Sequence, residues 1–130
     1  MRQPLNRPTD VELSILRILW ELGPATVRQV HEALCVARDE SLAYTAALKM
    51  MQTMTEKGLL KRDESGRSHI YRPAQARERT LRQLVDDLME RAFGGSALEL
   101  VNTALSDRPL DGAERLAVEK LLTKAKEKRS

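Results

Sequence analysis

Short polar side chains and one lysine recur between residues 44 and 56 at spacings that place them on one face of a helix. Small side chains let a helix backbone approach base edges, a methyl group can pack on that of thymine, and lysine can reach a guanine edge or a phosphate. We therefore predict that Thr45, Ala46 and Lys49 read bases, and that Gln52 and Thr53 continue this face toward the nucleic-acid backbone. The other side of the helix carries its apolar residues, which are Tyr44, Leu48, Met51 and Met54.

Four residues outside the base-reading set suit contact with phosphate. Thr26 and Arg28 begin the preceding predicted helix, where a helix N-terminus and a cation can hold phosphate together. Arg67 lies at the tip of a predicted turn, where its guanidinium can touch phosphate. Tyr44 is open between a core role for its ring and a phosphate contact through its hydroxyl.

Patterns typical of catalysis or metal binding are missing from the sequence. His31-Glu32 followed by Cys35 approaches a zinc-protease helix, but that site needs a second imidazole four residues after the first and a third ligand. The other histidine, His69, falls near the predicted turn. No serine lies in a nucleophile elbow and no glycine-rich loop follows a strand. We predict no enzymatic activity, no cofactor and no metal site.

Two predicted helices precede the polar one. Thr9 and Glu12 form a predicted capping box for the first helix, and Gly23-Pro24 ends it. Thr26 caps a shorter second helix. The apolar residues of the first helix are Val11, Ile15, Leu16, Ile18, Leu19 and Leu22, and those of the second are Val27, Val30 and Leu34.

A hairpin is predicted after the third helix. Lys57-Gly58 stops that helix, because glycine supplies the left-handed cap conformation. Leu59–Glu64 and Ser68–Pro73 then flank the turn Ser65-Gly66-Arg67. A core helix followed by a surface hairpin would give the same local pattern, but the two upstream helices favour a winged helix-turn-helix.

Three short amphipathic helices are predicted from Gln75 onward. Ser96 caps the second of them and Asp111 caps the third. Helices this short hardly stabilise themselves, so we predict that their apolar faces meet a second copy in a twofold homodimer. The alternative is a monomer in which they fold back on the winged helix. The predicted dimerisation residues are Leu81, Leu84, Val85, Leu88, Leu98, Val101, Leu105, Leu116, Leu121 and Leu122.

The predicted fold class is mainly α with a small β-hairpin wing, with a winged-helix domain over residues 1–73 and a helical dimerisation domain over residues 74–130. A charged fraction of 32% with 3% aromatic residues favours soluble, helix-rich structure. The net charge of +3 does not by itself identify a nucleic-acid partner. We expect a cytoplasmic protein without stable membrane insertion, because no signal-peptide pattern or long apolar run is present.

Cys35 is the only cysteine of the chain, which excludes an intrachain disulfide. One reading makes it a small apolar filler at the end of the second helix. The other makes it a redox or metal sensor thiol, for which the sequence offers no partner.

Three segments of the chain resemble the penicillinase repressor family, which includes the β-lactamase and methicillin-resistance repressors and their copper-responsive relatives. They are DVELSILRILWELGPATVRQVHEAL, LAYTAALKMMQTMTEKGLL and GRSHIYRP, and the similarity covers about residues 8–105. The most specific matches are Glu12–Trp20, Ala43-Tyr44-Thr45, Glu56–Leu59, and Gly66-Arg67 followed by Tyr71. The resemblance implies a repressor whose winged helix enters the major groove and whose C-terminal helices dimerise on a palindromic operator.

The resemblance also bears on induction. In the β-lactamase and methicillin-resistance branches, a membrane sensor-protease system leads to cleavage near an Asn-Phe bond in the dimerisation helices. The corresponding stretch here is Leu100–Thr103, in which no aromatic residue follows Asn102, so we assign no cleavage site. Copper-responsive relatives carry paired cysteines near the C-terminus, whereas LLTKAKEKRS has none. Ala46, Ala47 and Lys49 depart from the residues usual in the family, so the operator sequence is expected to differ.

Two other function classes stay open at this point. A winged helix can serve as a protein-interaction adaptor, and an apolar outer face on the third helix would favour that reading. A regulator with a small-molecule pocket between the two halves would need a cluster of aromatic or convergent polar residues, which the sequence does not mark.

Overall fold

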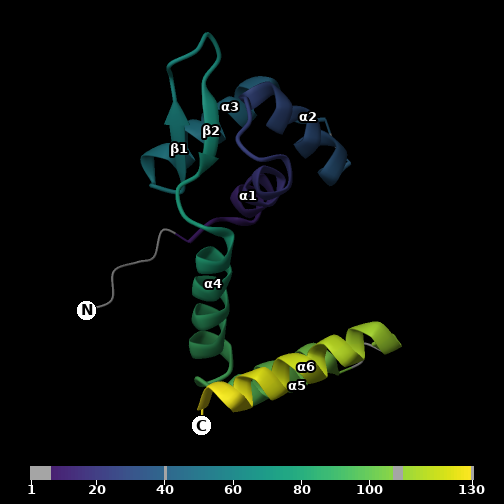
Figure 1. The fold of residues 1–130 in the computed structure, drawn as a ribbon. Coiled ribbons are helices and arrows are strands. Elements are labelled where there is room, and N and C mark those ends of the chain that lie inside the picture. The colour runs from purple at the N-terminus through teal and green to yellow at the C-terminus, as the bar shows by residue number, and fades with distance from the viewer. Residues whose placement is uncertain (1–6, 40, 107–109, 130) are drawn as a thin grey trace, which may run out of the picture. The chain divides into compact units, whose positions relative to one another are not determined.

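The structure is a computed structural model that describes residues 7–39, 41–106 and 110–129. Three helices and a hairpin come first and three further helices follow, which confirms the predicted fold class of a winged helix with a helical C-terminal region (Figure 1). The elements are α1 (Asp10–Leu22), α2 (Val27–Arg38), α3 (Tyr44–Glu56), β1 (Leu60–Asp63), β2 (Ile70–Pro73), α4 (Arg77–Ala92), α5 (Ala97–Leu105) and α6 (Gly112–Arg129).

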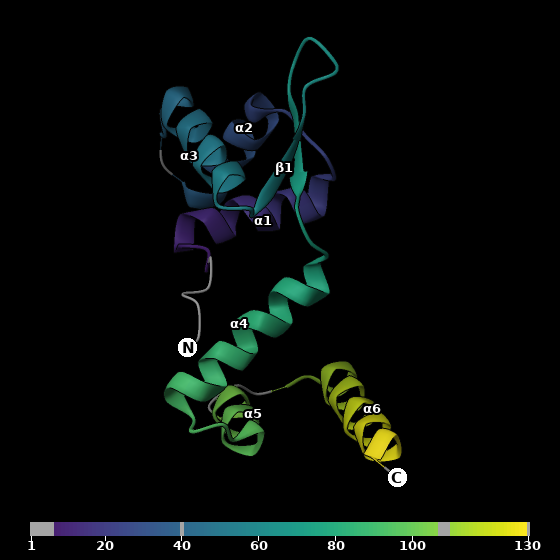
Figure 2. The ribbon, with the colours of Figure 1, turned by 90° about the vertical axis from the view of Figure 1, so that its left-hand side faces the viewer.

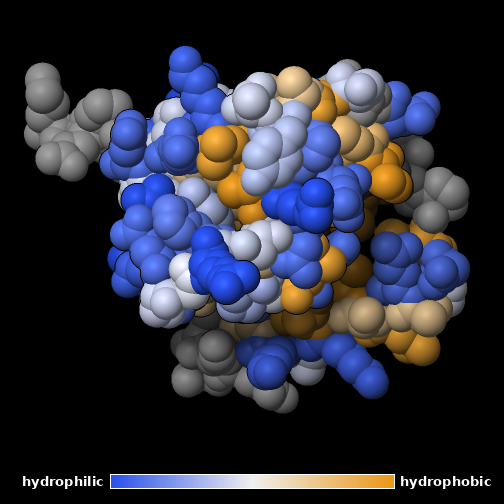
Figure 3. All heavy atoms as spheres, turned by 90° about the horizontal axis from the view of Figure 1, so that it is seen from above, coloured by the Kyte–Doolittle hydropathy of each residue, from blue (hydrophilic) through white to orange (hydrophobic). Residues whose placement is uncertain are grey.

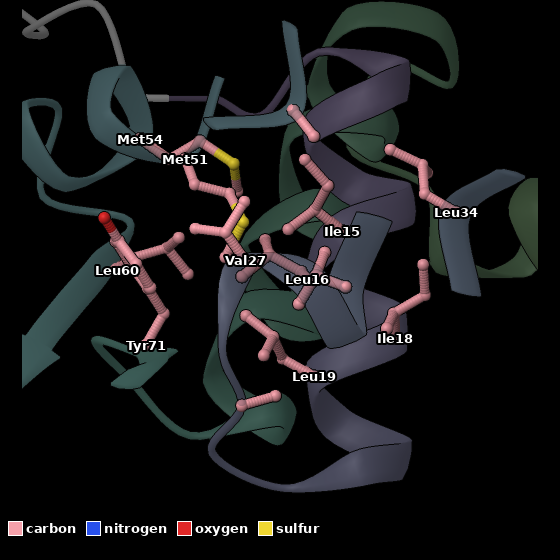
Figure 4. Close-up of a cluster of buried hydrophobic side chains, with 13 residues drawn as sticks. Ile15, Leu16, Ile18, Leu19, Val27, Leu34, Met51, Met54, Leu60 and Tyr71 are labelled. Carbon is pink, nitrogen blue, oxygen red and sulfur yellow. The ribbon is translucent and has the colours of Figure 1, made fainter. Parts of the chain in front are cut away.

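The hydrophobic core lies where α1 passes beneath α2 and α3 and meets the hairpin (Figure 2). Ala47, Met51 and Met54 turn one side of α3 fully into this core. In Figure 4, Leu60 and Tyr71 of the hairpin lie on the same side of the cluster as Met51 and Met54. The buried apolar residues are Ile15, Leu16, Ile18, Leu19, Ala25, Val27, Val30, Leu34, Ala47, Met51, Met54, Leu60 and Tyr71.

Two capping boxes fix the starts of α1 and α2. Thr9 Oγ1 accepts a hydrogen bond from the Glu12 N–H at 3.2 Å, and Glu12 Oε1 accepts one from the Thr9 N–H at 2.9 Å. Thr26 and Gln29 make the same reciprocal pair at 3.2 and 2.9 Å. Both predicted caps are confirmed, and each satisfies N–H groups that a helix start otherwise leaves unpaired.

The two predicted ends of helices are also confirmed. Gly23 and Gly58 follow α1 and α3 with φ of 82° and 84°, a region that glycine enters without strain. Leu22, predicted to be in the apolar stripe of α1, is instead 54% exposed because it lies at the last position before the chain turns away.

The wing is a two-stranded antiparallel sheet in which Leu60 pairs with Pro73 and Asp63 with Ile70. Its strands are shorter than predicted, because the Asp63 carboxylate accepts a hydrogen bond from the Ser65 N–H at 2.9 Å and the chain begins to turn there. Tyr71 of β2 also exchanges two backbone hydrogen bonds with Ala25, at 2.8 and 3.0 Å. The connection between α1 and α2 is therefore tied to the wing.

The last three helices differ in detail from the prediction. The first begins at Arg77 rather than at Gln75, and α4 and α6 have 16 and 18 residues, so two of the three are not short. The predicted caps of α5 and α6 are confirmed, since Ser96 Oγ accepts from the Glu99 N–H at 3.1 Å and Asp111 Oδ1 from the Glu114 N–H at 2.7 Å. Among the described residues, no helix is long and apolar enough to cross a membrane.

The chain divides into two compact units between Leu84 and Val85. The first two turns of α4 group with the winged helix, to which they are joined by the buried Thr80 and by Gln75, whose Nε2 donates to Thr80 Oγ1 at 3.0 Å. The Arg77 guanidinium also lies 5.7 Å from the centre of the Trp20 ring. The functional boundary predicted between residues 73 and 74 stays a prediction.

A partly buried ion pair joins the start of α1 to the end of α3. Glu12 is 6% exposed, and its two carboxylate oxygens accept hydrogen bonds from Lys57 Nζ at 2.8 and 3.0 Å. Burial raises the pKa of Glu12, but the hydrogen bonds from Lys57 and Thr9 and the charge of Lys57 together hold that pKa below its ordinary value of 4.5. The contribution of this carboxylate to stability is therefore complete above pH 4.5 and is lost as the pH falls through the lower folded pKa.

We expect Glu12→Gln to lower the free energy of unfolding at pH 7 by about 1 to 2 kcal/mol, less than for a fully buried pair because hydration of Lys57 offsets part of the loss. Urea unfolding at pH 7 and at pH 3 measures this difference, which should shrink at the lower pH. Glu21→Gln, at an exposed position of the same helix, is the control and should leave stability nearly unchanged. An equal difference at the two pH values would contradict this account.

Candidate nucleic-acid interface

The outer face of α3 is exposed and polar. Thr45, Lys49, Gln52 and Thr53 all lie on the solvent side, because the residues between them anchor the opposite side in the core. Ala46 is only half-buried and lies at the edge of this face. Five of the predicted contact residues thus share one surface. Its hydroxyl, amide and ammonium groups can form hydrogen bonds with base edges and with phosphate oxygens.

Tyr44 lies at the first position of α3 and is 46% exposed. Its ring meets the ring of His31 edge to face, with centroids 5.6 Å apart and planes at 82°. The ring is therefore held on one side by α2 and open to solvent on the other. Of its two predicted roles, membership of the buried core is wrong, since the core position in this turn is taken by Ala47, which the sequence pattern missed.

A groove of about 810 Å³ lies beside the start of α3. It is lined by the N-cap Thr26 and Arg28 at the start of α2, by Tyr44 of α3 and by Arg67 of the wing. The structure thus brings all four predicted phosphate-contact residues to one groove, although they come from three separate elements. The remaining lining residues are Val27, His31, Glu32, Leu48, Ser68, His69 and Tyr71.

Besides the four predicted residues, the groove is lined by polar residues that the prediction missed, among them His31, Ser68 and His69. His31 is half-buried and His69 is exposed. For His69, the sequence did contain a signal, because this residue comes two positions after Arg67 in the predicted wing. Nothing in the spacing of α2 alone indicated that His31 would face the start of α3.

The wing carries charges of both signs. Arg62 and Glu64 form an ion pair at 3.1 Å, and His69 Nε2 lies 3.7 Å from the same Glu64 carboxylate. The backbone hydrogen bond from Ser65 holds the pKa of Asp63 below its usual value, so this carboxylate accepts from the turn at neutral pH. Arg67 stands exposed at the tip that this turn creates.

Where Figure 3 looks down on the wing, hydrophilic side chains predominate and hydrophobic areas lie between them. A face of this kind suits a charged, hydrated partner better than an apolar helix or groove.

Cys35 is half-buried on α2, with its Sγ 3.5 Å from His31 Nε2 and 3.7 Å from the Leu42 carbonyl oxygen. Among the described residues, no group of three or more His, Cys, Asp or Glu side chains could hold a metal ion. The contacts of Cys35 lie at the turn between α2 and α3.

Comparison with known proteins places these features in a family. The model of the penicillinase repressor family matches residues 8–124. The transcriptional regulator BlaI from two strains of Mycobacterium tuberculosis is 37% identical over 89 residues, which make up 68% of this chain and 63% of that protein. The matched part therefore spans less than two thirds of the length of these relatives.

Solved structures with a similar fold have low sequence identity. A MarR family protein from Bacillus stearothermophilus has a TM-score of 0.53 at 19% identity, over 93% of this chain and 74% of that chain. The complex of hsRosR-SG has a TM-score of 0.55 at 18% identity, over 95% and 96% of the two chains. These likenesses concern the fold alone.

We expect Asp63→Ala to loosen the wing turn, because the Ser65 N–H loses its acceptor. Amide hydrogen exchange at Ser65 should become severalfold faster in this variant, while the melting temperature of the protein stays unchanged. Asp63→Asn keeps a side-chain oxygen at the same place and is the matched control, with exchange close to that of the unaltered protein. Equal protection of Ser65 in all three proteins would show that the side chain does not hold the turn.

Proposed function

Because this chain belongs to the penicillinase repressor family, we propose that it is a transcriptional repressor that binds a palindromic DNA operator as a homodimer. The observation that carries the proposal is the exposed polar face of α3 beside a groove where Thr26, Arg28 and Arg67 meet. The relatives in Mycobacterium tuberculosis bear the name transcriptional regulator, which supports the same conclusion. The family is one of regulators, and we propose no catalytic role for any residue.

In this proposal α3 lies in the major groove with its first turns against the bases. Thr45 is exposed in the first turn of α3, and its hydroxyl can donate to or accept from a base edge. Lys49, one turn further on, reaches a guanine edge or a phosphate. Ala46 offers a methyl group at the edge of the face, so its contact is with a thymine methyl rather than with a polar group.

Phosphate contacts flank the base contacts in this arrangement. Thr26 and Arg28 bring the positive end of α2 and a cation to one wall of the groove beside α3, and Arg67 brings a second cation to the other. The Tyr44 hydroxyl can bind a phosphate between them. Gln52 and Thr53 extend the same contacts along α3. Such contacts fix the position of the protein on the duplex without reading its sequence.

The homodimer is proposed from the apolar side chains of the second unit and the end of α4. Leu98, Leu116, Leu121 and Leu122 are between 58% and 79% exposed, and Val85, Leu88, Val101 and Leu105 between 37% and 47%. Leu81 and Leu84 are half-buried. This much exposed apolar surface supports an interaction in which a second copy covers it.

Dimerisation would make the second half-site contact intramolecular and raise avidity by about 10² to 10⁴. Loss of the dimer is therefore the step at which an inducing signal would release the operator. The adaptor alternative would need an apolar outer face on α3, and the exposed residues of that face are polar. The observations thus favour the DNA-binding function.

We expect Lys49→Ala and Arg67→Ala each to weaken operator binding, because each removes a cation from the proposed DNA-binding surface. The slope of log Kd against log salt concentration should fall by about one for each phosphate interaction that is removed. Fluorescence anisotropy with a labelled duplex from the promoter region, at several salt concentrations, measures both quantities.

Arg17→Ala is the matched control for charge, since Arg17 is exposed on α1 and lines a different hollow, with Ser14 and Arg38. Its affinity and salt slope should equal those of the unaltered protein. Identical operator affinity and salt slope in all the variants would contradict the assignment of the outer α3 face to DNA binding.

We expect the unaltered chain to have twice the 14.7 kDa mass of one chain in solution at micromolar concentration. Leu98→Glu should shift the protein toward monomer, because it places a charge on an apolar surface that the second copy would cover. Val36→Glu, at an equally exposed apolar position of α2, should leave the mass unchanged. Sedimentation equilibrium measures the mass of the unaltered protein and of both variants. A monomeric mass for the unaltered protein would rule out the dimer.

A further inference from the structure

The start of α3 lacks the side-chain cap that other helices of the chain have. Thr9, Thr26 and Ser96 accept hydrogen bonds at the starts of α1, α2 and α5. The corresponding residue of α3 is Ala43, which has no side-chain acceptor. The first turn of α3 nevertheless carries residues that the proposed function requires to be well placed, so contacts from other parts of the chain gain importance there.

His31 contacts the chain on both sides of this uncapped start. Its Nε2 makes a short contact with the carbonyl oxygen of Leu42, two residues before α3. A carbonyl can only accept, so Nε2 carries the proton in this hydrogen bond. The same ring packs edge to face against Tyr44, the first residue of α3. One side chain of α2 therefore holds the residues on both sides of Ala43.

The surroundings of His31 restrict its movement. Cys35 lies one turn further along α2, with its Sγ 3.5 Å from His31 Nε2 and 3.7 Å from the Leu42 carbonyl oxygen. Val30 and Leu34, its neighbours on α2, are completely buried. The ring thus projects from a part of α2 that is anchored in the core. Its contacts with Leu42 and Tyr44 therefore restrict the movement of the start of α3.

We propose that His31 is a positioning residue for DNA recognition, which fixes the first turn of α3 by holding the Leu42 carbonyl and the Tyr44 ring. It acts through Tyr44 and Thr45 and need not touch DNA itself. This inference rests on the proposed function. Base contacts need exact geometry whereas phosphate contacts tolerate displacement, so the loss of His31 affects an operator more than a random duplex.

Two substitutions separate the hydrogen bond of His31 from its ring packing. His31→Phe keeps an aromatic ring against Tyr44 and loses the hydrogen-bond donor, whereas His31→Gln keeps a donor and loses the ring. His31→Ala loses both. We expect His31→Ala to weaken operator binding about tenfold, as for the loss of one hydrogen bond and one aromatic interaction. Random duplex should lose less than about threefold, because the cations that bind it remain. The other two variants should fall between.

Amide hydrogen exchange of residues 43–47 provides a readout that does not depend on DNA. Exchange in this first turn should become faster in His31→Ala and partly recover in His31→Phe and His31→Gln. Exchange in the second half of α3 should stay the same. His69→Ala is the matched control, since His69 is the other histidine of the groove and lies on the wing. It should leave the first turn of α3 unaffected.

Equal losses on operator and random duplex, or unchanged exchange at residues 43–47 in His31→Ala, would overturn the positioning role. If the unaltered protein bound no operator, the proposed function would fail, and the exchange measurement would still decide whether His31 fixes the start of α3. The two failures are therefore distinguishable.

Discussion

The burial of one side of α3 is the constraint on which the rest of the molecule depends. Ala47, Met51 and Met54 are completely buried, and the helical repeat then leaves the intervening polar residues no direction except outward. The Glu12–Lys57 ion pair fixes the end of the same helix to α1. Packing thus determines which residues of α3 can meet a partner, before any of their own chemistry is considered.

Local signals made much of the fold predictable from the sequence. The caps at Thr9 and Thr26 and the stop at Gly58 depend on residues within one turn, and all three are as expected. Membership of the penicillinase repressor family, expected from short motifs, is confirmed. The long-range features were less accessible: Ala47 is small enough to look neutral in a pattern, yet it lies fully buried where α3 meets the core.

The candidate interface shows the same division between local and tertiary information. Periodicity alone placed Thr45 and Lys49 on an outer face. The groove beside them exists because the wing, α2 and α3 converge, and no spacing within one element encodes that convergence. His31 is the sharpest example, since it contacts the turn 11 residues further along the chain. A net charge of +3 gave little guidance, because the cations that line the groove come from separate elements.

The pair of backbone hydrogen bonds between Ala25 and Tyr71 has a mechanical consequence. Ala25 immediately precedes Thr26, the N-cap of α2, and Tyr71 lies in the strand that leads from the wing tip, so these bonds join the backbone at the start of α2 to the base of the wing. In the proposed complex with DNA, the start of α2 and the base of the wing would therefore keep nearly the same separation. Under the proposed function, adjustment would then fall more to the duplex, whose stiffness varies with its base sequence, and sites that deform easily would gain an advantage at positions the protein never touches.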